Sequence, residues 1–165
     1  MAMVNAAERN RIISAVATRV MSLPQSERRY AVIGYCWGGG TTFMHVVNGG
    51  VSGFAGGVAY YGLPYMNGAT PIRDSLAKIK VPVMLFNGSK DARIGAAMPA
   101  VDSAMKALGK NYVGTNYEGA VHGFMRSQDD PKATRDVTEE AANLAATKDA
   151  WPRTVQILKQ NLGVR

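Results

Sequence analysis

The sequence is poor in the residues that build disulfide frameworks and metal sites. It has one cysteine and two histidines among 165 residues. A single cysteine excludes an intrachain disulfide and a cysteine-rich zinc site, and it favours a reducing compartment such as the cytoplasm. With so few ligands of the right type, a metal centre is not expected. No cofactor is implied either.

Long apolar runs are also missing from the chain. No stretch reaches the ~18 consecutive apolar residues that a membrane-spanning helix needs. Residues 1–11 contain no apolar segment of signal-peptide length. We therefore expect a cytoplasmic protein with no membrane partner.

Acidic residues are fewer than basic ones. The chain has 12 Asp and Glu against 19 Lys and Arg, which gives a net charge of +7 and a pI near 9.7. The basic residues are scattered, without a long run or a stripe interleaved with aromatics, so nucleic acid is not an expected partner. The positive charge is compatible with an anionic small molecule.

Charged residues are entirely absent from residues 30–72, which we expect to form the interior of a single domain spanning 1–165. Short apolar runs of the kind that form buried parallel strands lie at residues 30–34, 54–61, 81–87 and 111–117. Helical segments are expected between or after them, at residues 38–47, 74–78, 97–108 and 151–162. This alternation predicts an α/β fold with a mostly parallel sheet of about four strands flanked by helices.

Two further helices are predicted outside this alternation. In residues 5–22, apolar side chains recur with the helical period, which predicts a helix. Residues 127–149 are charged at first and then alanine-rich, which favours a loop followed by a surface helix. Asp136 or Thr138 is the candidate cap of that helix.

A glycine-rich turn after the first strand has the pattern of a nucleophile elbow. Gly34-Tyr-Cys36-Trp-Gly38 places a cysteine in the nucleophile position where a strand meets a helix. Such a corner is tight and strained, so glycines are expected two residues before and after the nucleophile. The amide of Trp37 would face an oxyanion, and the helix N-terminus would favour a thiolate. The alternative is a βα turn with a buried, inert cysteine.

A carboxylate and a histidine follow two later strands. Asp91 comes just after the third strand and His122 just after the fourth, so Cys36, Asp91 and His122 occur in the chain order of the α/β-hydrolase triad. Asp91 could also be an ordinary turn aspartate. The other histidine, His45, falls within a predicted helix and is most simply a packed or surface residue.

These motifs resemble those of the dienelactone hydrolase family of the α/β-hydrolase fold. The similarity lies in Gly34-Tyr-Cys-Trp-Gly-Gly, Gly88-Ser-Lys-Asp, His122-Gly-Phe and Asp149-Ala-Trp. By that resemblance, Cys36 is the nucleophile, His122 the general base and acid, and Asp91 the group that fixes the histidine tautomer.

The resemblance also implies substrate contacts. Arg126 matches a family arginine that binds the substrate carboxylate, although a solvated loop arginine is an equal alternative. Tyr61 and Phe124 are candidate pocket residues, and so is the ring of Trp37. Apolar residues at strand ends more often complete the core, so a core role is the alternative for Tyr61, Phe124 and Trp37.

Measured against the family, the chain corresponds to a truncated α/β-hydrolase fold without roughly the first third. Family members carry there several strands, a glutamate that interacts with the resting cysteine, a second arginine, and a loop that supplies another oxyanion N–H. Without those strands, the apolar strand at residues 30–34 becomes a sheet edge, which favours pairing with another chain. We therefore expect a homodimer formed through this edge or through helix 5–22.

The resemblance implies a hydrolase for a small, anionic ester or lactone, acting through a thioester on Cys36. A thioesterase or a general carboxylesterase would use the same residues with a different pocket. A rival of another class is a non-catalytic binding or assembly module that retains the triad residues. Histidine-dependent reactivity of Cys36 would discriminate between enzyme and module.

Overall fold

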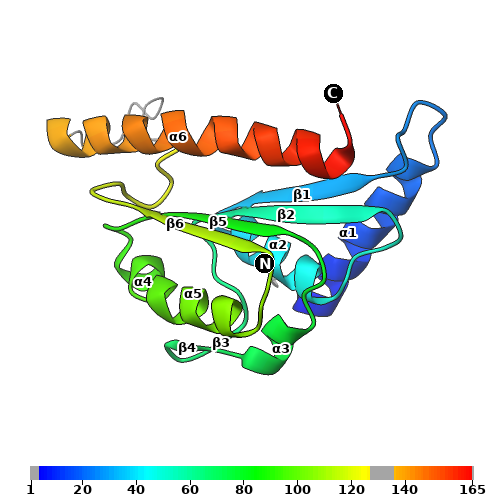
Figure 1. Cartoon of the computed structure of the whole chain (residues 1–165), viewed down its shortest axis with the longest axis horizontal. Helices are drawn as coiled ribbons and strands as arrows, with labels where there is room; N and C mark the ends of the chain where they lie inside the picture. The colour runs from blue at the N-terminus through cyan, green and yellow to red at the C-terminus, as the bar shows by residue number, and fades with distance from the viewer. Residues whose placement is uncertain (1–3, 127–135, 165) are drawn as a thin grey trace.

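Four parallel strands form the central sheet of the computed structural model, which describes residues 4–126 and 136–164 (Figure 1). Their order across the sheet is β1-β2-β5-β6. The strands are β1 (Tyr30–Tyr35), β2 (Phe54–Tyr60), β5 (Val83–Gly88) and β6 (Tyr112–Tyr117). The predicted α/β fold and its four strands are confirmed, with strand ends within two residues of those expected.

Helices cover both faces of this sheet (Figure 1). On one face lies α6 (Val137–Leu162); on the other lie α2 (Trp37–Val47), α3 (Arg73–Ala77) and α5 (Met98–Ala107). Successive residues of a strand point to opposite faces. Accordingly, Ala59 and Leu85 belong to the core cluster beneath α2 and α5, whereas Tyr60 and Phe86 belong to the cluster beneath α6.

The C-terminal helix differs from its prediction. The structure has one helix of 26 residues where a surface helix and a separate terminal helix were expected. The side chain of Asp136 caps it by accepting hydrogen bonds from the amides of Thr138 and Glu139. Ala146 and Ala150 are buried, because their small side chains let the helix lie close to the sheet. The start of the predicted loop, residues 127–135, lies outside the described residues.

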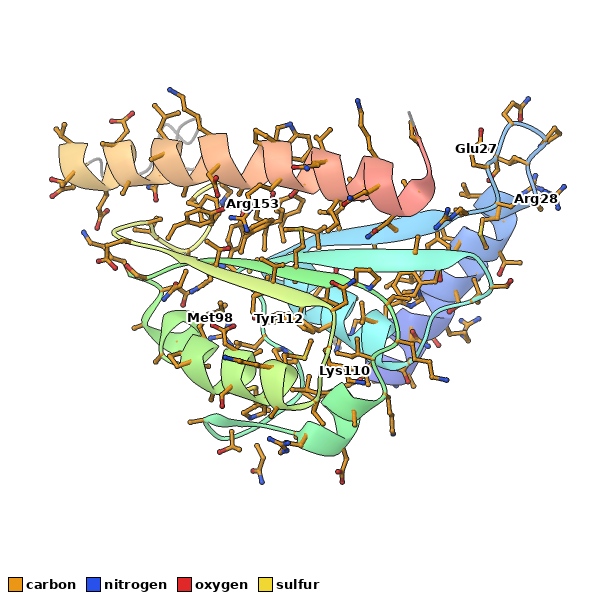
Figure 2. All side chains as sticks on the ribbon, in the orientation of Figure 1. Glu27, Arg28, Met98, Lys110, Tyr112 and Arg153 are labelled. Atoms are coloured by element: carbon orange, nitrogen blue, oxygen red, sulfur yellow. The ribbon has the colours of Figure 1, made fainter. Side chains whose placement is uncertain are left out.

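Polar contacts also join α6 to the sheet. The hydroxyl groups of Tyr60 and Thr154 share a buried hydrogen bond of 2.7 Å. Burial raises the pKa of Tyr60 to about 12, so this hydroxyl stays protonated at physiological pH. Figure 2 shows Arg153 between α6 and the sheet, where its guanidinium carbon lies 5.0 Å from the centre of the Phe86 ring.

The first helix lies where the sequence pattern predicts it, with its apolar side chains uncovered. α1 (Ala6–Met21) begins after Asn5, whose side chain accepts a hydrogen bond from the amide of Glu8. Its apolar side chains are largely solvent-exposed: Ile12 is 44%, Val16 57% and Val20 48% exposed. The helical prediction is therefore confirmed, and no described element covers this side of α1.

The strand next to α1 lies at the edge of the sheet. β1 pairs with β2 alone among the described strands, which confirms the expected edge position. Its residues are mostly half-buried, so the strand is not covered on both faces as its apolar sequence suggested.

Smaller elements complete the described chain and were not predicted. They are a two-stranded hairpin, β3 (Met66–Asn67) with β4 (Thr70–Pro71), and the one-turn helix α4 (Ala92–Gly95). No helix in the described ranges combines the length and apolarity that a membrane crossing needs. Within those ranges there is also no cluster of three or more His, Cys, Asp or Glu side chains that could hold a metal ion.

Candidate active site

Cys36 occupies a strained corner between β1 and α2. Its backbone has φ 55° and ψ −118°, a conformation that residues with a Cβ rarely adopt. Three hydrogen bonds hold it there: the Cys36 amide donates to the Tyr60 carbonyl at 3.0 Å, and the Cys36 carbonyl accepts from the Gly39 amide at 3.0 Å and from the Gly40 amide at 3.4 Å. The side chain is solvent-exposed, so the alternative of a buried, inert cysteine does not apply.

The glycines around Cys36 are required for different reasons. A Cβ on Gly34 would lie 1.9 Å from the Gly38 carbonyl oxygen, and one on Gly39 would lie 2.5 Å from the Tyr60 carbonyl oxygen. At Gly38 a Cβ would meet nothing within 4 Å. The prediction that glycine is required is therefore confirmed at Gly34, two residues before the cysteine. It is wrong at Gly38, two residues after the cysteine, and the crowded position on that side is Gly39.

Asp91 and His122 form a hydrogen-bonded pair at the carboxyl end of the sheet. His122 Nδ1 donates to Asp91 Oδ2, while Asp91 Oδ1 accepts from the Ile94 amide at 3.2 Å. The Asp91 side chain is only 9% exposed and that of His122 is 38% exposed. With Nδ1 committed to the carboxylate, Nε2 of the neutral imidazole is a proton acceptor.

The loop that carries His122 is fixed from two sides. The Val121 amide donates to the side-chain oxygen of Asn143 on α6 at 2.9 Å, and the Gly119 amide donates to the Ser89 hydroxyl at 2.9 Å. Asn143 is buried. Sequence reasoning missed both polar partners, because each acts on a backbone amide far away in the chain.

A cavity of about 520 Å³ brings Cys36 and His122 together with two other predicted site residues, Tyr61 and Arg126. The ring centres of Tyr61 and His122 are 5.0 Å apart. Burial raises the pKa of Tyr61 well above its usual value, so its hydroxyl is neutral at physiological pH. Tyr35 and Met125 also line this cavity and were not predicted as site residues.

Two predicted site residues lie elsewhere. Phe124 is fully buried in the core beneath α6, packed edge-on against Tyr61, so the core alternative is the one observed. Trp37 is 53% exposed and lines a second cavity of about 610 Å³, which also contains Cys36. As the first residue of α2, Trp37 has an amide that the helix leaves without an internal acceptor.

His45 lies outside the site, as its position in a helix suggested. It is fully buried, with Nε2 bonded to the Tyr30 hydroxyl at 2.9 Å and Nδ1 to the Asn10 side chain at 2.8 Å. Burial lowers the pKa of His45, which favours a neutral ring. His122 is therefore the histidine of the candidate site.

The sequence matches the dienelactone hydrolase family over residues 2–162. The chain belongs to this family. Cys36 and His122 line one cavity, and Asp91 is hydrogen-bonded to His122 outside its lining. No curated protein matches the sequence.

Solved structures similar to this family member share its fold at low sequence identity. A protein assigned as a dienelactone hydrolase from Klebsiella pneumoniae is 19% identical, with a TM-score of 0.72 over 98% of this chain and 63% of its own. A dienelactone hydrolase-like promiscuous phosphotriesterase from metagenomic libraries is 22% identical, with a TM-score of 0.62 over 90% and 62% of the two chains. The chain thus spans less than two thirds of the length of these relatives.

Proposed function

We propose that this chain is a cysteine-dependent hydrolase that cleaves a small, anionic ester or lactone through a thioester intermediate. The observation that carries the proposal is the shared cavity of Cys36 and His122, with Asp91 bonded to the far side of the imidazole. A nucleophile, a base and a group that orients the base are the minimum set for acyl transfer. Membership of the dienelactone hydrolase family supports the same reaction class.

The proposed reaction uses each of these groups in turn. His122 Nε2 takes the proton of the Cys36 thiol, and the thiolate attacks the ester carbonyl. The oxyanion receives a hydrogen bond from the Trp37 amide, and His122 then protonates the leaving oxygen. In the second half, His122 takes a proton from water and the hydroxide attacks the thioester carbonyl. The C–S bond then breaks, the acid leaves, and His122 returns its proton to the Cys36 thiolate. Arg126, in the same cavity, is the proposed partner of a carboxylate on the substrate.

Alkylation of Cys36 tests the proposal directly. Because Cys36 is the chain's single cysteine, the mass increase after treatment with iodoacetamide reports on this thiol alone. A free thiol is only a few per cent thiolate at pH 7, so proton transfer to His122 should raise the alkylation rate about tenfold or more over that of the urea-unfolded chain. His122→Gln should remove this enhancement.

Two results would count against the hydrolase. One is a Cys36 alkylation rate in the native wild type equal to that of the unfolded chain. The other is an equal alkylation rate in wild type and a folded His122→Gln variant. Either result would favour the binding or assembly module in its place. A reducing cytoplasm, which the lone cysteine favours, would keep the thiol in the form that the reaction needs.

We also propose that two copies associate through the side of the molecule formed by β1 and α1. β1 leaves one edge unpaired among the described strands, and Ile12, Val16 and Val20 form an exposed apolar stripe along α1. An unpaired strand edge and an apolar stripe both gain by burial against a second copy. The proposal is a two-fold homodimer.

Sedimentation velocity at micromolar concentration should show a dimer that Val16→Glu converts to a monomer. The reason is that a carboxylate in an apolar interface loses its hydration without gaining a partner. Val137→Glu is the matched control, because Val137 is 82% exposed at the start of α6 and away from this stripe. A well-folded wild-type monomer, or equal dissociation of both variants, would refute the dimer.

A further inference from the structure

Cys36 lines two cavities, and the proposed catalytic groups other than Trp37 lie at only one of them. The first contains His122 and Arg126. The second lies beside α2 and contains Trp37, Arg9 and Arg93, and His122 is not among its lining residues. Since His122 must reach the leaving oxygen to protonate it, the leaving group of a substrate belongs in the first cavity. The acyl group is then directed to the second cavity.

The second cavity is positively charged. Its only charged lining residues among those described are Arg9 and Arg93, and no carboxylate faces them there. Neither arginine forms an ion pair within the described part of the chain. Because a guanidinium keeps its charge at any physiological pH, the cavity presents two uncompensated cations.

Arg9 is held in a defined position within this cavity. One terminal nitrogen donates to the Thr41 hydroxyl at 2.8 Å, and the guanidinium carbon lies 4.7 Å from the centre of the Trp37 ring. Its Nε is buried without a hydrogen-bond partner. A cation that is already oriented and partly removed from water attracts an anion more strongly than a mobile surface arginine does.

The same contacts connect Arg9 to the nucleophile elbow. The Thr41 hydroxyl that accepts from Arg9 donates in turn to the Trp37 carbonyl at 3.1 Å. Trp37 directly follows Cys36 in the chain. Arg9 and Cys36 also line the same cavity, so an anion held by Arg9 would share that cavity with the reacting sulfur.

We propose that Arg9 is a specificity-determining residue that binds a carboxylate at the far end of the acyl group, with Arg93 as a second cation in the same cavity. The preferred substrates are then half-esters of dicarboxylic acids, whose single carboxylate lies with Arg9 in the second cavity, while Arg126 in the first cavity serves substrates that carry a carboxylate on the leaving group. This inference rests on the proposed hydrolase for its chemical step: Cys36 forms a thioester with the acyl group, the alcohol leaves with the proton from His122, and water releases the dicarboxylate and restores the thiol. Binding of the dicarboxylate itself does not depend on that step.

Calorimetric titration of the Cys36→Ala protein with succinate, adipate and suberate tests the binding site without any turnover. At least one of these should bind more tightly than the monocarboxylate of equal length. Arg9→Gln, which retains a donor for Thr41, should weaken that binding about tenfold, because a charge-assisted hydrogen bond is lost. Arg9→Lys should restore part of it.

Arg19→Gln is the matched control, since it removes the same charge from an exposed position of α1. It should leave dicarboxylate binding unchanged. Equal weakening by the Arg9 and Arg19 variants, or no preference for any dicarboxylate, would overturn the inference. If Arg9→Gln fails to fold, Arg93→Gln in the same background should still weaken binding, and unchanged binding would again overturn it.

A kinetic comparison separates this inference from the proposed function. Protein with Cys36 intact is given the 4-nitrophenyl half-ester of the best dicarboxylate and the neutral ester of equal length. Arg9→Gln should lower kcat/KM for the half-ester about tenfold more than it lowers kcat/KM for the neutral ester. Arg9-dependent binding without turnover of either ester would refute the hydrolase and support the anion site.

Discussion

Replacing Cys36 by alanine is expected to lower kcat for the hydrolysis of 4-nitrophenyl acetate by ~10³-fold or more. The loss is large because, in the proposed mechanism, the thiolate both forms and breaks the bond to the acyl carbon, and the sequence offers no second thiol. The measurement is nitrophenolate release by wild type and variant, purified identically, with a dienelactone as a second substrate.

The alanine variant should also have the same backbone strain at position 36 as wild type. Position 36 has φ 55°, and alanine carries the same steric penalty there as any residue with a Cβ. Equal melting temperatures would show that only the thiol has been removed. Cys36→Gly should be inactive as well but should melt at a higher temperature, because glycine adopts positive φ without strain. Equal turnover by wild type and a folded alanine variant would refute a catalytic role for Cys36.

Gly34→Ala is expected to destabilise the fold by ~3 kcal/mol or more, or to prevent folding. The added Cβ would lie 1.9 Å from the Gly38 carbonyl oxygen and 2.4 Å from Thr42 Oγ1. Relief of this clash requires β1 and the first turn of α2 to separate, and that movement would disrupt the elbow. Urea unfolding followed by circular dichroism measures the loss.

Gly38→Ala is the matched control for this prediction. It adds the same methyl group four residues later, where nothing lies within 4 Å. Because position 38 is within α2, alanine should leave the free energy of unfolding unchanged or raise it by up to about 1 kcal/mol through its higher helix propensity. Similar stabilities of the two variants would contradict the close contact between strand and helix at Gly34.

The sequence was sufficient to predict the parts of the molecule that depend on local pattern. Short apolar runs indicated all four strands of the sheet, and the order of Cys36, Asp91 and His122 indicated the residues at its carboxyl edge. Strand-end residues of a parallel sheet meet at one edge whatever the lengths of the connections between them. For this reason the position of each residue after a strand was enough to bring them together.

Features that depend on packing between distant segments could not be predicted in this way. The apolar period of α1 predicts a helix, but periodicity does not say whether another element covers its apolar side chains. Arg9 and Asn143 carry no motif, and their roles arise from contacts with Trp37 and Val121 that only the folded chain makes. Phe124 was expected as a candidate pocket residue, but its packing beneath α6 places it in the core.

The hydrogen bond from the Val121 amide to Asn143 makes the final position of the histidine loop depend on α6, which is synthesised after the rest of the site. Asn143 belongs to α6, the last element of the chain, and α6 packs on the face of the sheet that includes Tyr60. During synthesis the N-terminal elements emerge first, so the elbow can form before α6 exists. The loop that holds His122 acquires its final support only when α6 docks. Recovery of Cys36 reactivity during refolding should therefore coincide with the docking of the last helix and lag behind formation of the sheet.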